Sequence, residues 1–244
     1  MKPQILYEDD YLLVIDKPAG VVVNRAESIK GETVQDWVEQ KLKVQSAKFK
    51  VVENSDFVRR AGIVHRLDKE TSGVLIVAKT SDAFENLQAQ FKERKVEKSY
   101  VALVHGCVEP EEGTISAPVG RLPWNRERFG VLPGGREAET RYKVESRKYR
   151  VFGNKREEFS LLELYPKTGR THQIRVHLKS IGHPVVGDMF YAGRKTARHD
   201  RQWCPRLFLH AQSIIFQHPS ENRKVTVTSP LPEDLSRALK TLSV

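Results

Sequence analysis

The chain has 244 residues, with 41 Lys and Arg side chains against 31 Asp and Glu side chains, so its formal net charge is +10 and its pI is near 9.6. Hydrophobic residues make up 39% of the chain and charged residues 30%, which is typical of a globular protein and excludes a disordered or membrane-embedded one. No apolar run approaches the roughly 20 residues of a membrane-spanning helix, and the N-terminus lacks the layout of a secretory signal, so we expect a cytoplasmic protein.

The first third of the chain predicts two strands, a helix and a polar connection. Apolar residues 5–7 and 12–15 predict two strands that are separated by the turn Glu8-Asp9-Asp10. Thr33 is expected to cap a helix, because apolar residues follow it at helical spacings in Val34, Trp37, Val38 and Leu42. Residues 43–60 are polar and basic with little periodicity, so we expect a mobile connection there.

The stretch from Gly62 to Thr80, GIVHRLDKETSGVLIVAKT, predicts a charged loop that leads into a buried strand at residues 74–78. Loops held by a rigid sheet often carry catalytic residues. Asp68 lies beside His65 and Arg66 in the sequence, and neighbouring cations favour the ionised form of a carboxylate, so Asp68 is a candidate base or nucleophile. The alternative is that Asp68 only caps its own turn, as Asp commonly does.

The middle of the chain predicts a helix, a strand and a long loop. Ser81 is the expected cap of the helix, whose inward side would carry Phe84, Leu87 and Phe91. Residues 99–105 predict a strand that is buried on both faces, because their alternation is imperfect. Residues 113–135 are rich in Gly, Pro and Arg, and we expect a loop over this range.

The C-terminal half predicts a hairpin from the strands at 140–145 and 159–165. Thr171 is expected to cap a helix whose apolar side carries Ile174, Leu178 and Ile181. Residues 191–206 predict a second basic loop. The remaining expected elements are strands at 207–216 and 224–228 and a terminal helix with Leu235, Leu239 and Leu242 facing inward.

Arginine is concentrated in the two predicted loops. The first holds Arg121, Arg126 and Arg128 around Trp124, and the second holds Arg194, Arg198 and Arg206 around Trp203. Cations mixed with an aromatic ring in a Pro/Gly-rich segment suit an RNA backbone and its unstacked bases, and a domain pI above about 9 is typical of nucleic-acid binding. A solvated basic surface is the alternative interpretation.

Other chemistries lack the residues they need. Cys107 and Cys204 are far apart and predict neither a disulfide framework nor a zinc site, and His172 and His177 are five residues apart without the carboxylate of a metal helix. Residues 187–196 fail the spacing of a phosphate-binding loop. No nucleophile elbow or dinucleotide fingerprint is present, so we expect a reaction without a metal or a cofactor.

HRLDKETSG at residues 65–73, followed by a strand, resembles the signature of the RluA family of pseudouridine synthases, enzymes that isomerise uridine to pseudouridine within RNA. The segments at 6–23 and 164–188 resemble two further segments of that family, so the resemblance covers nearly the whole chain. His65 places the chain in this branch, because the neighbouring RsuA-type branch usually has Gly there. Asn24-Arg25 departs from the His-Pro that is common in the family.

The resemblance implies roles for four residues. Asp68 would be the catalytic residue, and Arg175 would pair with it, although an Arg at this helix position could also be an ordinary surface cation. Tyr100 would stack on the flipped base, and Arg66 would fill the gap that the base leaves in the RNA. His65 is expected beside Arg66 among the RNA-binding residues.

We therefore expect one α+β domain over residues 1–244, with a mixed, mostly antiparallel central sheet flanked by helices as in pseudouridine synthases. The expected function is isomerisation of specific uridines in ribosomal or transfer RNA, by a monomer that needs no metal, cofactor or membrane. A non-catalytic RNA-binding protein or RNA chaperone is the first alternative. A hydrolase that removes the flipped base is the second.

Overall fold

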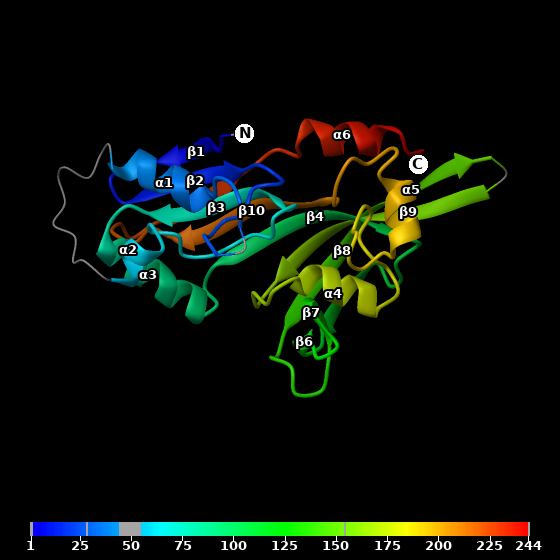
Figure 1. The fold of residues 1–244 in the computed structure, drawn as a ribbon, viewed down its shortest axis with the longest axis horizontal. Coiled ribbons are helices and arrows are strands. Elements are labelled where there is room, and N and C mark those ends of the chain that lie inside the picture. The colour runs from blue at the N-terminus through cyan, green and yellow to red at the C-terminus, as the bar shows by residue number, and fades with distance from the viewer. Residues whose placement is uncertain (1, 28, 44–54, 154, 244) are drawn as a thin grey trace. The chain divides into compact units, whose positions relative to one another are not determined.

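The computed structural model describes residues 2–27, 29–43, 55–153 and 155–243, and the chain forms two compact units (Figure 1). The first unit comprises residues 1–97 and 211–230, and the second comprises residues 98–210 and 231–244. Both units combine helices with largely antiparallel strands, which confirms the expected α+β class. That the two units fold as one domain stays a prediction.

The first unit contains a sheet in the strand order β1-β2-β3-β10, and β11 pairs with the second half of β10. Its strands are β1 (Gln4–Glu8), β2 (Leu12–Lys17), β3 (Ser72–Ala78), β10 (Leu209–Gln217, from residue 211 onward) and β11 (Lys224–Thr228). Every residue of β3 is buried, as expected for the apolar run that follows the charged loop. This central strand is therefore a rigid support for the loop that precedes it.

Three helices accompany this sheet: α1 (Val34–Lys43), α2 (Asp56–Arg59) and α3 (Ser81–Lys92). The start of α1 is capped as expected, because the Asp36 amide donates to the Thr33 hydroxyl (3.2 Å) and the Thr33 amide donates to the Asp36 carboxylate (2.7 Å). Phe84 and Leu87 of α3 pack in one hydrophobic cluster with Ile76 of β3.

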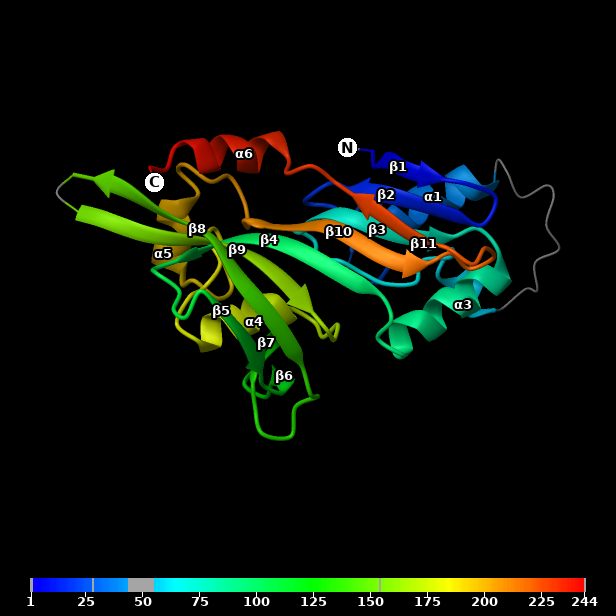
Figure 2. The same cartoon turned by 180° about the vertical axis from the view of Figure 1, so that it is seen from behind.

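The second unit contains a sheet in the strand order β4-β9-β8-β5 and a separate two-stranded sheet (Figures 1 and 2). The strands of the larger sheet are β4 (Glu97–His105, from residue 98 onward), β5 (Glu112–Ser116), β8 (Glu139–Phe152) and β9 (Lys155–Pro166). The two-stranded sheet consists of β6 (Val119–Leu122) and β7 (Asn125–Val131). All of these pairings with a defined register are antiparallel.

The helices of the second unit are α4 (Gln173–Ser180), α5 (Arg194–Asp200) and α6 (Glu233–Lys240). The main core of this unit joins apolar residues of β4 and β9 to Leu178 of α4 and Leu235 of α6. Leu242 is buried although it lies beyond the end of α6.

Several expected boundaries were wrong. Residues 113–135 are not a loop, because they contain β6, β7 and most of β5, and the predicted loop at 191–206 contains α5. Thr80, not Ser81, caps α3. His172, not Thr171, occupies the cap position of α4, with φ 56 and no side-chain cap bond. Ile181 ends that helix with 37% of its surface exposed, so it does not belong to the buried face.

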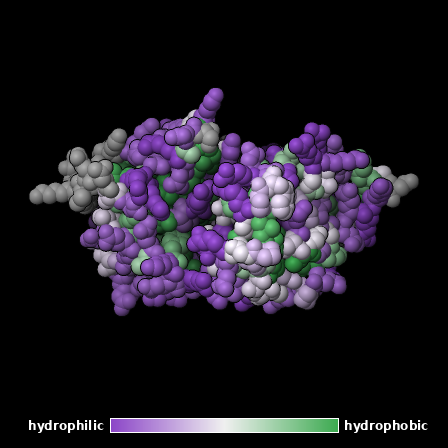
Figure 3. All heavy atoms as spheres, turned by 60° about the horizontal axis from the view of Figure 1, so that its bottom comes forward, coloured by the Kyte–Doolittle hydropathy of each residue, from purple (hydrophilic) through white to green (hydrophobic). Residues whose placement is uncertain are grey.

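The expected mobile connection at 43–60 contains α2, while its residues 44–54 lie outside the described part of the chain. Among the described residues, none of the helices is both long enough and apolar enough to cross a membrane. Hydrophilic residues cover most of the molecular face in Figure 3.

Candidate functional site

The loop that carries Asp68 is fixed at both ends by glycines. Gly62 has φ 73 and Gly73 has φ 115, a region of backbone conformation that other residues rarely adopt. A Cβ atom on Gly62 would lie 2.0 Å from the Ala78 carbonyl oxygen, and one on Gly73 would lie 2.1 Å from the Ala211 carbonyl oxygen. Only glycine therefore fits where the loop leaves and rejoins the sheet.

Within the loop, the apolar side chains are buried and the charged ones are not. Val64 and Leu67 are buried at 8% and 5% exposure, whereas Arg66 is exposed and Asp68 is half-buried. The Asp68 carbonyl accepts a hydrogen bond from the Thr71 amide (3.1 Å), which closes a turn directly after the candidate catalytic residue. The two buried side chains anchor the loop and leave the two charged ones accessible.

His65 holds this loop against β3. The Ile76 amide donates to His65 Nε2 at 2.9 Å, and the imidazole ring lies against the Phe91 ring with centroids 4.9 Å apart. Because Nε2 accepts this bond, any ring proton resides on Nδ1 and the imidazole is neutral while the bond persists. The structure thus gives His65 a positioning role beside Asp68, and its expected contact with RNA stays a prediction.

Lys17 is fully buried and bonds residues 17–21 to the Asp68 loop. Its ammonium group donates to the carbonyl oxygens of Pro18 (2.8 Å), Val21 (2.9 Å) and Lys69 (3.2 Å). The Lys69 carbonyl also accepts from the Gly20 amide (2.7 Å). One buried cation therefore fixes the backbone immediately after Asp68, a role that the sequence did not reveal.

Arg175 lies in the second unit on α4 and is held by Asp188. Its Nε donates to Asp188 Oδ2 at 2.7 Å and its Nη2 donates to Asp188 Oδ1 at 2.9 Å. The guanidinium carbon lies 5.0 Å from the centroid of the Tyr191 ring and 5.5 Å from that of Phe190. Arg175 is only 4% exposed, so it is not the surface cation of the alternative interpretation.

A buried polar network sets the position of α4. His177 lies between the Thr140 hydroxyl on Nδ1 and the Ala117 carbonyl on Nε2, each at 3.0 Å. Gln173 donates to the Thr140 hydroxyl as well, at 3.0 Å. Burial lowers the pKa of His177, and its bond to the Ala117 carbonyl opposes that shift only in part. The helix that carries Arg175 is thus bonded directly to β8.

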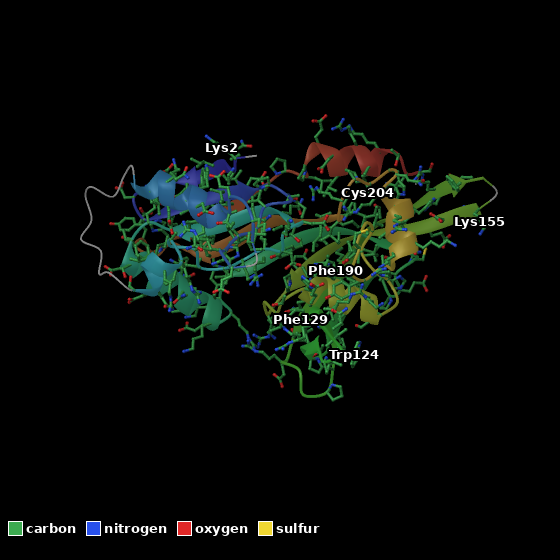
Figure 4. All side chains as sticks on the ribbon, in the orientation of Figure 1. Lys2, Trp124, Phe129, Lys155, Phe190 and Cys204 are labelled. Carbon is green, nitrogen blue, oxygen red and sulfur yellow. The ribbon has the colours of Figure 1, made fainter. Side chains whose placement is uncertain are left out.

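The hairpin of β6 and β7 gathers the three arginines predicted in the first loop. Arg121 and Arg126 are exposed, and Arg121 Nη1 donates to the Arg126 carbonyl at 2.7 Å. Arg128 lies 5.8 Å from the Phe190 ring, and Arg121 lies 5.1 Å from the Phe129 ring. Figure 4 shows Trp124 at the end of this hairpin, and its side chain is 76% exposed.

Tyr191 joins this hairpin to α4. Its hydroxyl accepts from the Phe129 amide (3.1 Å) and lies 2.8 Å from His172 Nδ1. The centroid of the His172 ring lies 5.7 Å from that of Phe129 and 5.9 Å from that of Phe190. Arg121, Arg128 and Arg175 therefore contact rings of one aromatic cluster.

Tyr100 lies on β4 and is half-buried against the core of the second unit. Lys98 is two residues earlier, so the pleat of the strand directs both side chains to the same face. Burial lowers the pKa of Lys98 to about 8. Lys98 therefore gives up its proton more readily than an ordinary lysine, on the same face of β4 as the predicted base-stacking residue.

The arginines of the second predicted loop have different surroundings. Arg194 and Arg198 are exposed on one side of α5. Arg206 is 9% exposed, and its Nε and Nη2 donate to the two carboxylate oxygens of Asp234 at 2.6 and 3.1 Å. Arg206 is therefore committed to an internal ion pair, and we leave it out of the RNA-binding surface proposed below.

Sequence reasoning missed Lys17, Asp188, His177 and Tyr191 as site residues. Lys17 and Asp188 could have been found from the sequence, because both lie in segments that resemble the family: Lys17 in residues 6–23 and Asp188 at the end of residues 164–188.

Both cysteines are free, and burial raises the pKa of Cys204 to about 12. Within the described ranges, no group of three or more His, Cys, Asp or Glu side chains has the arrangement of a metal site.

The sequence model of the RNA pseudouridylate synthase family matches residues 11–180, which include the Asp68 loop, Tyr100 and Arg175. The chain belongs to this family. An RNA pseudouridine synthase of Mycobacterium bovis is 40% identical over 98% of this chain and 72% of its own length. A protein of Pseudomonas aeruginosa named ribosomal large subunit pseudouridine synthase D is 39% identical over 95% of this chain and 69% of its own length.

Solved structures of this family share the fold. The human RNA pseudouridylate synthase domain containing 1 is 29% identical, with a TM-score of 0.70 over 94% of this chain and 83% of its own. These similarities confirm the expected family, its pseudouridine synthase fold and the enzyme class, an isomerase that acts on RNA.

Proposed function

We propose that this enzyme converts specific uridines of ribosomal RNA to pseudouridine, with Asp68 as its catalytic residue. The observation that carries the proposal is the construction of the Asp68 loop. Two glycines with no room for a side chain fix its ends, and Lys17 and His65 hold its backbone. A carboxylate held in this way is preorganised for chemistry, which a turn cap would not require.

The reaction breaks the bond between N1 of uracil and C1′ of ribose and forms a bond between C5 and C1′. The C5 proton leaves and a proton returns to N1, so the reaction consumes no other reactant. Asp68 would attack the sugar, attack the base or remove a sugar proton. All three roles require an ionised carboxylate.

Three further residues are proposed to act on the same uridine. Tyr100 would stack on the base after it leaves the RNA helix, and Arg66 would occupy the space that the base vacates, a role that suits its exposed, planar cation. Arg175 would pair with Asp68 and orient its carboxylate. The bidentate contact with Asp188 supports this role, because it fixes the direction of the guanidinium.

Five arginines are proposed to contact phosphates. Arg121, Arg126 and Arg128 share the β6–β7 hairpin with the exposed Trp124, a combination that suits single-stranded RNA. Arg194 and Arg198 are the corresponding exposed cations of α5.

The printed name of the Pseudomonas aeruginosa relative makes large-subunit ribosomal RNA the first substrate to test, and transfer RNA the second. We propose that the enzyme acts in the cytoplasm, as a monomer, without a metal or cofactor. Mapping of pseudouridines in cellular RNA with and without the gene would name the modified position.

Tritium release from RNA that contains 5-tritiated uridine is the decisive assay. The proposal expects tritium release without loss of the base from the chain. A non-catalytic RNA-binding protein would release none, and a base-removing hydrolase would release free uracil, so either result would overturn the proposal.

A further inference from the structure

The β8–β9 hairpin is much longer than its sequence predicted. Its strands contain 14 and 12 residues, and they pair continuously as far as Phe152 and Lys155. The end of this hairpin projects beyond α5 in Figures 1 and 2, and Figure 4 shows Lys155 near its tip. None of the residues proposed above to act on the uridine lies on this end of the hairpin.

The tip is distant from the helix that carries Arg175. Thr140, at the start of β8, is bonded to His177 and Gln173 of α4, and Phe152 follows twelve residues later. At roughly 3.3 Å per strand residue, the two ends of β8 are about 40 Å apart, or somewhat less because of the bulge after Val144. The tip therefore lies at the opposite end of β8 from the residues that bond this strand to α4.

The distal half of this hairpin is strongly basic. Residues 147–158 include five cationic side chains, Arg147, Lys148, Arg150, Lys155 and Arg156, against the two carboxylates Glu157 and Glu158. Arg147 pairs with Glu109 at 3.5 Å and with Glu111 at 3.7 Å, and Arg156 Nε lies 4.0 Å from Glu158 Oε1. Among the described residues, Lys148, Arg150 and Lys155 form no ion pair with a carboxylate. Several positive charges are thus left without neutralisation by the protein itself.

Aromatic rings lie among these cations. The guanidinium of Arg156 is 4.1 Å from the centroid of the Tyr149 ring, and that of Arg150 is 5.1 Å from the Trp203 ring. Phe152 is 54% exposed and Val151 is 62% exposed at the tip. A surface of cations and accessible rings suits RNA, because phosphates bind the charges and unstacked bases bind the rings.

Helix α5 extends this surface. His199 of α5 packs edge-on against Phe152 with ring centroids 5.0 Å apart, so the helix lies beside the distal hairpin. The exposed side of the helix adds Arg194, Lys195 and Arg198, which form no ion pair within the described ranges. We call residues 147–153, 155–158 and 194–201 together the basic arm.

We propose that the basic arm binds phosphates of the RNA substrate at nucleotides other than the modified uridine. The arm would add affinity for long or folded RNA through phosphate contacts, and it would leave the chemical step unchanged. This inference rests on the proposed RNA substrate, but it can be tested by binding alone. If the arm instead binds a protein partner, a variant that lacks charges of the arm should bind RNA as the wild type does.

The binding test uses a fluorescent 30-base-pair RNA duplex of arbitrary sequence and the triple variant Lys148→Gln, Lys155→Gln and Arg156→Gln. The control variant, Lys143→Gln, Arg237→Gln and Lys240→Gln, removes the same charge from exposed positions of the same unit outside the arm. Each lost phosphate contact should flatten the slope of log affinity against log salt by roughly 0.7 to 0.9. We expect the arm variant to lose about two such contacts or more, and the control variant fewer than one.

Equal slopes for the wild type and the arm variant would overturn the proposal, as would equal losses in both variants. A second experiment uses two transcripts centred on the mapped uridine, a short stem-loop and a fragment of about 100 nucleotides. The arm variant should modify the short transcript at the wild-type rate and show a several-fold higher KM for the long one. If neither transcript is modified by the wild type, the proposed function fails, while the duplex experiment still decides the role of the arm.

Discussion

Asp188 grips Arg175 in a bidentate ion pair, with Nε–Oδ2 and Nη2–Oδ1 distances of 2.7 and 2.9 Å, and both side chains are almost fully buried. Asp188 Oδ1 also accepts the backbone amides of Phe190 (2.9 Å) and Tyr191 (3.1 Å). The same carboxylate therefore sets both the guanidinium and the two rings on which it rests. Arg175 has one orientation because three neighbours are fixed together.

Asp188→Asn should destabilise the fold and slow isomerisation. The change leaves a buried guanidinium without its counter-charge, which typically costs about 3 to 5 kcal/mol of unfolding free energy. Urea denaturation measures the loss, with Asp82→Asn on the exposed start of α3 as the control. Wild-type stability in the Asp188 variant would show that the pair has little structural weight.

Asp68→Asn should abolish tritium release while the protein remains folded and still binds RNA. Asparagine keeps the size of the side chain and a polar group that can form hydrogen bonds, but it cannot carry the negative charge that a base or nucleophile needs. Activity, melting temperature and RNA affinity are measured on the same preparation. Release at the wild-type rate by folded variant protein would contradict the catalytic assignment.

Lys17→Met should lower the unfolding free energy by at least about 2 kcal/mol, because three carbonyl oxygens lose a charged donor in a dry site. Activity should fall as well, since the backbone after Asp68 is released. Lys69→Ala is the matched control, because only the carbonyl of Lys69 takes part in this contact. Thermal and chemical denaturation should separate the two variants clearly.

Stability should decrease with acid in a window set by His177. Burial places the folded pKa of His177 below its ordinary value of 6.5, so the unfolded chain takes up a proton first as the pH falls. His177 therefore stabilises the fold above about pH 6.5, and this contribution is lost as the pH falls towards its folded pKa, by up to about 1.4 kcal/mol per pH unit. The His177→Gln variant should lose less stability than the wild type between pH 6.5 and 5.

Replacement of Arg121, Arg126 and Arg128 by Gln should weaken RNA binding and flatten its salt dependence by roughly one unit of slope per lost phosphate contact. Arg128 also lies against Phe190, so a single Arg128→Gln variant is needed to separate charge from packing. Filter binding over a salt series gives the slope. An unchanged slope would identify these arginines as a solvated surface.

Arg66→Ala should slow the reaction on structured RNA more than on a loosely folded fragment, because its proposed role is to support extrusion of the base. Initial rates on the same target sequence, in a stable stem-loop and in an unstructured oligonucleotide, provide the comparison. Equal losses on both substrates would assign Arg66 to general RNA binding.

The sequence was most informative where one local pattern determines the structure. The Asp68 loop and the buried β3 follow from a charged turn before a β-branched run, and the cap of α1 follows from Thr33 before apolar residues at helical spacings. The sequence was least informative where contacts between residues far apart in the chain determine the structure. The β6–β7 hairpin has the composition of a loop and is held by Tyr191, some sixty residues away, through the Phe129 amide. No local pattern reports such a contact.

The buried partners of charged groups could not be predicted either, because no local sequence pattern reports these contacts. Arg206 has the composition of an RNA-binding loop around it, and only the packing of α6 shows that Asp234 neutralises it. Lys17 resembles an ordinary turn lysine until the three carbonyl oxygens around it are located. Helix α5 was missed because six of its seven residues are polar or charged, and the single apolar residue, Ala197, gives no periodicity.

Gly62 and Gly73 have a consequence for saturation mutagenesis of this enzyme. Any side chain at either position would overlap a backbone carbonyl oxygen at 2.0 or 2.1 Å, so every substitution should eliminate function regardless of its chemistry. In a screen that scores activity alone, substitutions at both positions would lose activity as fully as those at Asp68, and the two glycines would be mistaken for catalytic residues. A parallel screen for abundance of folded protein would tell them apart, because the glycine variants should disappear from it and Asp68→Asn should remain.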